Sequence, residues 1–163
     1  MFKLKPITKD SIPRALEKAE RYRLLNEPSE AESICLDILL VEPENQRALI
    51  TLVLALTDQF ENGTKVHEAR DVLPRLWDDY QKLYYAGIVC ERRGMALLDH
   101  GGPGSGYVAY DWLSEAMEWY EKAEKLRPSG NDDAILRWNT CARTIMQKNL
   151  HAGPRERAES QLE

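Results

Sequence analysis

The chain has 163 residues, of which 43% are hydrophobic and 30% are charged, and its formal net charge at pH 7 is −5. This length and composition predict one globular domain and exclude a disordered chain, which lacks enough apolar side chains to build a core. The negative charge also argues against a nucleic-acid partner, because proteins that bind nucleic acids gather Lys and Arg to neutralise phosphates.

The cysteines and the apolar segments indicate a reducing, aqueous compartment. Cys35, Cys90 and Cys141 lie far apart without the CxxC or Cys/His spacing of a zinc site, and each has apolar neighbours. Isolated buried cysteines are typical of a compartment that keeps thiols reduced. The longest apolar run, residues 48–56, is much shorter than the roughly 20 residues of a membrane span, and residues 1–10 lack the apolar centre of a signal peptide. We therefore expect a cytoplasmic protein with no membrane partner.

Helical periodicity dominates the chain from its N-terminal part onward, and the alternating pattern of strands is missing, which predicts an all-α fold. After an extension over residues 1–10, Ser11 is a candidate N-cap of a first helix that ends at the break in residues 26–28. A second helix ends near Pro43, and a third runs over about residues 46–60.

Pro74 interrupts the otherwise helical stretch of residues 64–82. An interior proline costs about 3 kcal/mol because it removes a hydrogen bond and clashes with the preceding turn. We therefore expect a short helix that ends near Val72 or Leu73, and a new helix with Pro74 in its first turn. The helical pattern then continues over residues 83–98.

The glycine-rich stretch DHGGPGSG, residues 99–106, predicts a flexible loop. A phosphate-binding P-loop needs Lys and Ser/Thr directly after its last glycine, whereas Tyr107 and Val108 follow here. A long helix is expected over about residues 107–127, followed by a last helix over residues 132–149.

Two segments, residues 31–43 and 116–128, share one skeleton in which an alanine opens the helix and a proline closes it. Tyr120 and Ala123 stand at helical spacing in the second segment, and Gly87 lies in the helix before it. These residues resemble the tetratricopeptide repeat family, whose unit is a helix pair of about 34 residues with small side chains where the helices cross.

The resemblance implies a right-handed α-solenoid of about three helical hairpins with a C-terminal capping helix, and it places Ala31, Gly87 and Ala116 in the interior. The repeats are degenerate, since Cys35 and Ile38 occupy the family's aromatic and small positions. Another α-solenoid or an irregular helical bundle is the alternative. The expected division is an N-terminal extension (1–10), one domain (11–149) with hairpins at about 11–43, 46–80 and 81–128 and a capping helix at 131–149, and a flexible C-terminal tail (150–163).

No pattern in the sequence frames a catalytic centre. His67, His100 and His151 lack the paired spacing of metal ligands, and no GxSxG elbow surrounds a serine. We therefore expect a protein that is not an enzyme and that needs neither a metal nor a cofactor.

The resemblance also implies where a partner binds, because the family lines its concave face with residues of the leading helix in each pair. The Lys and Asn with which some members clamp a terminal carboxylate are absent here, so the implied groove is apolar and aromatic with charges at its rim. Such a groove suits a peptide or an amphipathic helix of a protein partner. For Ile50 and Leu54, packing inside the solenoid is an equal alternative. The implied partner-binding residues are Arg47, Ile50, Leu54, Tyr84, Tyr85 and Ile88.

The expected function is that of a non-enzymatic adaptor for protein–protein interaction. A cytoplasmic chaperone that masks an apolar segment of one client is an alternative, because small acidic tetratricopeptide chaperones of secretion systems are similar in length and charge. A self-assembling structural module is another, in which Trp112, Trp119 and Trp138 form a homo-oligomer, although core packing is the commoner fate of tryptophan on a helix.

Overall fold

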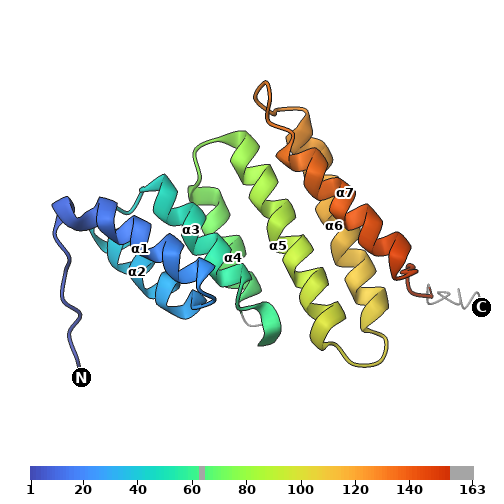
Figure 1. Cartoon of the computed structure of the whole chain (residues 1–163), viewed down its shortest axis with the longest axis horizontal. Coiled ribbons are helices and arrows are strands. Elements are labelled where there is room, and N and C mark those ends of the chain that lie inside the picture. The colour runs from blue at the N-terminus through green and yellow to red at the C-terminus, as the bar shows by residue number, and fades with distance from the viewer. Residues whose placement is uncertain (63–64, 155–163) are drawn as a thin grey trace, which may run out of the picture.

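The computed structural model of this chain describes residues 1–62 and 65–154, and within them the regular structure is entirely helical (Figure 1). This confirms the predicted all-α fold. The predicted tail lies outside the described residues from position 155 onward. None of the described helices has both the length and the apolar character needed to pass through a lipid bilayer. The α-helices of the described residues are α1 (Ile12–Leu24), α2 (Pro28–Val41), α3 (Gln46–Thr57), α4 (Val66–Val72), α5 (Asp79–His100), α6 (Ser105–Glu124) and α7 (Asp133–Gln147), and the 3-10 helices are η1 (Lys9–Ser11), η2 (Phe60–Asn62) and η3 (Leu73–Arg75).

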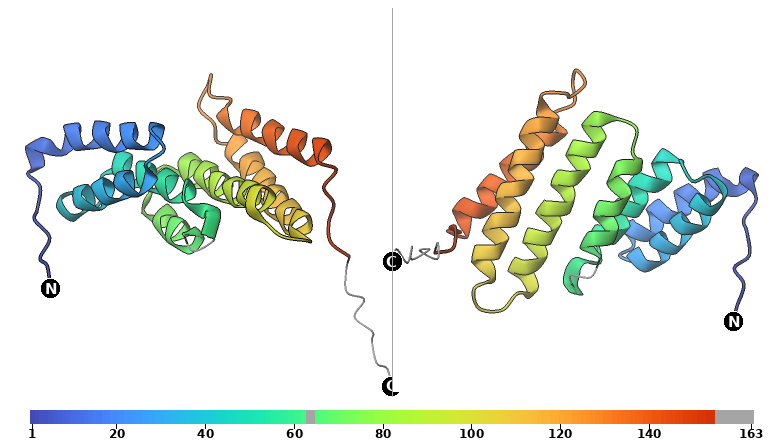
Figure 2. Two further views of the ribbon diagram at one scale, coloured as in Figure 1. Left: turned by 60° about the horizontal axis from the view of Figure 1, so that its bottom comes forward. Right: turned by 180° about the vertical axis from the view of Figure 1, so that it is seen from behind.

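Each helix packs against the next one along the chain, so that α1–α2, α3–α4 and α5–α6 form helical hairpins and α7 packs along α6 (Figure 1). Seen from the side, α1 and α7 stand above α3 and α5, and the face of these four helices is shallowly concave (Figure 2, left). We refer to this face as the inner face. The side formed by α2, α4 and α6 is the outer face.

The structure agrees with the prediction for the helix before Pro74 but differs from it in the segment that follows. α4 ends at Val72, which confirms the expected stop, but the proline opens only the short η3 turn instead of a new α-helix. Leu76 is extended, and α5 begins after Asp78, whose side chain accepts a hydrogen bond from the backbone N–H of Gln81 at 3.2 Å. As a result α4 spans seven residues, whereas α5 spans 22.

The glycine-rich loop is shorter than predicted. α5 extends through His100 and α6 begins at Ser105, so the loop contains only residues 101–104. Gly104 adopts a φ of 82°, in the left-handed region that glycine tolerates, and the chain turns there into α6.

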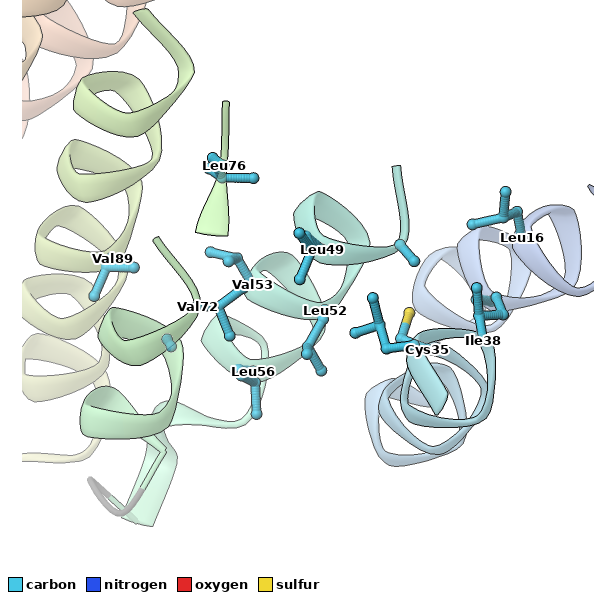
Figure 3. Close-up of a cluster of buried hydrophobic side chains, with 14 of the residues drawn as sticks. Leu16, Cys35, Ile38, Leu49, Leu52, Val53, Leu56, Val72, Leu76 and Val89 are labelled. Carbon is cyan, nitrogen blue, oxygen red and sulfur yellow. The ribbon is translucent and has the colours of Figure 1, made fainter. Parts of the chain in front are cut away.

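Two clusters of buried side chains form the interior. The first belongs mainly to α1–α4 and is completed by Leu76 and by Val89 of α5 (Figure 3). The second lies among α5, α6 and α7, with Leu113 of α6 fully buried in it. Tyr85 and Trp112 pack against both clusters. The two halves of the molecule are therefore joined through α5 and through Trp112 of α6.

The small residues that the repeat pattern places in the interior are buried there. Ala31 and Ala116 have 0% exposed surface, and Gly87 is buried as well. A Cβ added at Gly87 would lie 2.7 Å from Cδ1 and 2.9 Å from Cζ of Tyr120. Glycine is required at this position because the ring of Tyr120 occupies the space of a larger side chain.

Gly87→Ala should destabilise the protein by about 1–3 kcal/mol, because the added methyl group must push the buried Tyr120 ring away from α5. Thermal melting followed by circular dichroism measures the loss. Gly102→Ala is the matched control, since a Cβ there meets no heavy atom within 4 Å. Equal melting temperatures for the two variants would contradict the close approach of α5 and α6.

Candidate functional site

Arg47 of α3 lies on the inner face, where it is bound to a neighbouring helix. Its guanidinium donates from Nε to Oε1 of Glu20 at 2.7 Å and from Nη2 to Oε2 at 2.8 Å. The hydrogen bond from Arg47 lowers the pKa of the Glu20 carboxyl. Because both side chains are largely exposed, the pair contributes little to stability, and its main effect is to fix the orientation of Arg47.

The apolar residues predicted for the groove differ in their exposure. Ile50 and Leu54 of α3 are partly buried and pack against the first and the second cluster, respectively. Ile88 of α5 is 1% exposed and is a member of the second cluster. Ile88 therefore offers a partner almost no open surface in this structure, contrary to the prediction.

Tyr84 and Tyr85 belong to a group of packed rings and do not stand free in a groove. Tyr84 stacks on Tyr80 with ring centroids 5.8 Å apart, meets Tyr85 edge-on at 5.1 Å and lies 5.9 Å from Tyr120. Burial raises the pKa of Tyr85 to about 12. Both predicted anchors are partly buried, so they contribute to the core as well as to the inner face.

A buried carboxylate, that of Glu91, connects three helices. Glu91 is 3% exposed; it accepts a hydrogen bond from the hydroxyl of Tyr120, and its Oε1 accepts another from Nη1 of Arg137 in α7 at 3.3 Å. Sequence reasoning missed this residue because a glutamate followed by two arginines resembles a surface charge. Its spacing is the signal that could have found it, since it lies four residues after Gly87 and therefore on the stripe that faces α6.

The hollow on the inner face is polar, unlike the apolar groove that the resemblance implies. It has a volume of about 310 Å³ and lies among the C-terminal parts of α1, α3 and α5. Arg23 and Asp58 on its wall form an ion pair at 2.6 Å, and His100 lies 3.7 Å from Glu61. The apolar and aromatic residues predicted for the groove lie in a row of side chains on α3 and α5, outside this hollow.

An apolar hollow lies instead on the outer face, between α4, η3, α5 and α6, with a volume of about 390 Å³. At its edge, Nη2 of Arg70 is 3.4 Å from Oε1 of Glu115, and the same guanidinium lies over the ring of Trp112, 4.8 Å from its centre. We call this feature the outer hollow. Its lining includes Leu73, Pro74, Lys82, Leu83, Ala86 and Trp119.

The tryptophans considered for self-association, Trp112, Trp119 and Trp138, are all partly buried. The ammonium of Lys122 lies 4.6 Å from the centre of the Trp119 ring, and Trp138 donates from Nε1 to Oε1 of Glu121 at 3.0 Å. These side chains are therefore engaged within the chain itself.

Trp77 is the most exposed tryptophan, with 66% of its surface open to solvent. Its backbone N–H donates to Oε1 of Gln46 at 2.9 Å, and Arg75 donates from Nη2 to the carbonyl of Pro43 at 2.7 Å. Helical periodicity gives no information about its exposure, because the residue lies in the link between η3 and α5.

The three cysteines are free and buried, which confirms the burial expected from their apolar neighbours. Burial raises the pKa of Cys35 and of Cys141 to about 12 and that of Cys90 to about 11. Across residues 1–62 and 65–154, no group of three or more His, Cys, Asp or Glu side chains is arranged to hold a metal ion.

Resemblance to known proteins gives no independent support for either surface. No protein-family model, no curated protein and no solved structure matches this chain. The functional assignment therefore depends on the geometry of the inner and outer faces.

Glu91→Ala should lower the free energy of unfolding by about 2–4 kcal/mol, because Tyr120 and Arg137 lose the acceptor that they share. Arg137 is partly exposed and can turn to water, so most of the loss comes from Tyr120. Urea denaturation measures the change. Glu118→Ala, at an exposed position of α6, is the control and should change stability by less than about 0.5 kcal/mol. Equal stabilities would show that the buried network contributes nothing.

The raised pKa values of the thiols predict a loss of stability at alkaline pH. An unfolded cysteine ionises near its ordinary pKa of 9.0, whereas the buried thiols stay protonated to about pH 11 or 12. The unfolded chain therefore releases protons first, and the free energy of unfolding should fall as the pH rises above about 9.

Melting temperatures measured from about pH 7 to about pH 10.5 test this dependence. Cys141→Ala should give a shallower decline than the unmodified chain, because it removes one of the three buried thiols. A melting temperature that stays constant across the range would mean that the thiols are not protected from water.

Proposed function

We propose that this chain is a non-enzymatic, tetratricopeptide-like interaction module that binds a protein partner on its inner face. In this proposal the helices form a right-handed α-solenoid of about three hairpins, and α7 is its capping helix. The order of packing, in which each helix lies against the next along the chain, supports it. The buried small residues Ala31, Gly87 and Ala116, at positions where the family's helices cross, support it as well.

The observation that carries the proposal is a row of partly buried apolar and aromatic side chains on the concave face. Ile50 and Leu54 belong to α3, and Tyr84 and Tyr85 belong to α5; these two helices lie between the raised helices α1 and α7 (Figure 2, left). Such side chains give a partner a large apolar contact area with polar edges. A peptide or an amphipathic helix laid across α3 and α5 would bury them further.

Two arginines beside this row are paired within the chain, which favours recognition by shape over recognition by charge. Arg47 binds Glu20, and Arg23 binds Asp58. The proposed partner is a protein or peptide and not a nucleic acid, in agreement with the net charge of −5. The proposed place of action is the cytoplasm.

Ile50→Lys should weaken the binding of the natural partner at least about tenfold, because it places a charge within the apolar row. The partner is identified by pull-down from native lysate and mass spectrometry, and its affinity for the purified chain is measured by calorimetry. Tyr84 and Tyr85 are less suitable targets, since their loss would also disturb the packed rings of the core.

Leu40→Lys is the matched control for Ile50→Lys, since Leu40 is 66% exposed on α2. Circular dichroism must show that both variants melt as cooperatively as the unmodified chain. If both variants bind the partner with equal affinity, the inner face is not the binding surface.

A further inference from the structure

The outer hollow is open because the helical structure is interrupted at Pro74. Pro74 ends the regular helix before it, so the seven-residue α4 covers only part of the 22-residue α5. Seen from behind, α4 and α6 lie on either side of α5 (Figure 2, right). Leu83 and Ala86 of α5 therefore line an open hollow, which no helix of the described residues fills, together with Leu73 and Trp119. This space exists before any ligand arrives, which lowers the cost of binding.

The size of the outer hollow fits part of a polypeptide better than a whole domain. Its volume of about 390 Å³ lies near the lower end of the range of small-molecule sites, which is about 300–1,000 Å³. One or two large apolar side chains would fill it. Leu73, Leu83 and Trp119 are partly buried and would lose their remaining contact with water.

The charges around the outer hollow are mainly positive, although the whole chain is negative. Arg70 and Lys82 are among its lining residues, and Glu115 is the carboxylate beside them. Glu115 already contacts Arg70 at 3.4 Å, whereas Lys82 makes no ion pair with any residue in the described part of the chain. The nearby Asp78 is occupied as the cap of α5. An acidic group entering the hollow therefore finds a free ammonium beside an apolar floor.

We propose that the outer hollow is a second docking site, separate from the inner face, for a short peptide segment that combines a large apolar side chain with an adjacent aspartate or glutamate. The apolar side chain occupies the space between Leu83 and Trp119. The carboxylate pairs with Lys82, and the ammonium of Lys122 over Trp119 adds positive charge on the same side. Two surfaces of different chemistry allow one chain to bring two partners together.

Selection from a random phage-displayed peptide library against the intact chain tests this site. The selected peptides are synthesised with a fluorescein label, and their affinities are measured by fluorescence anisotropy. We expect peptides in which Trp, Phe or Leu stands next to Asp or Glu. Their affinity should fall about tenfold in Lys82→Glu and further in Ala86→Trp, which fills the hollow. It should also fall as the salt concentration rises.

Two controls separate this site from the inner face and from the effect of net charge. Lys18→Glu makes the same charge change at an exposed position of α1, and Ile50→Lys alters the inner face; both should leave the affinity unchanged. If Ala86→Trp fails to melt cooperatively, Lys82→Glu decides alone, since it changes only a partly exposed side chain. The proposal is overturned if no peptide is enriched, if the enriched peptides are basic, or if their binding is lost in Ile50→Lys and kept in Lys82→Glu.

Discussion

The approach of Gly87 to the ring of Tyr120 is the contact on which the C-terminal half of the molecule depends. It brings α5 and α6 close enough for the Tyr120 hydroxyl to reach the buried carboxylate of Glu91. The same carboxylate accepts from Arg137 and so holds α7 in place. Burying a carboxylate is costly unless donors surround it, and here two other helices provide them. Because Gly87 has no side chain, α5 and α6 can pack closely, and the network around Glu91 then links both helices to α7.

The two faces of the molecule differ because their charged residues are used differently. On the inner face, two arginines are bound to carboxylates of neighbouring helices, in the pairs Arg47–Glu20 and Arg23–Asp58. On the outer face, the break at Pro74 exposes a stretch of α5 on which Lys82 has no such partner among the described residues. Shape and apolar contact would therefore govern recognition on the inner face, whereas the outer hollow would add a requirement for charge.

The features that the sequence predicts correctly depend on local geometry. Pro74 stops a helix wherever it stands in the interior, and Gly87 belongs to a pattern of small residues set by the crossing of two helices. The burial of Ile88 and Glu91 and the exposure of Trp77 depend on how neighbouring elements pack, which one sequence does not specify. The outer hollow was missed for the same reason, since it results from the length of α4 relative to α5.

The short length of α4 also affects how the two halves of the molecule are coupled. In an array of helical hairpins, each unit is stabilised mainly by its neighbours. Here α4 has only seven residues, and Tyr85 of α5 and Trp112 of α6 pack against both clusters. Damage at α1 or α7 would loosen one end, whereas damage at α5 would uncouple both halves at once. α5 is the helix that contacts elements of both halves of the protein.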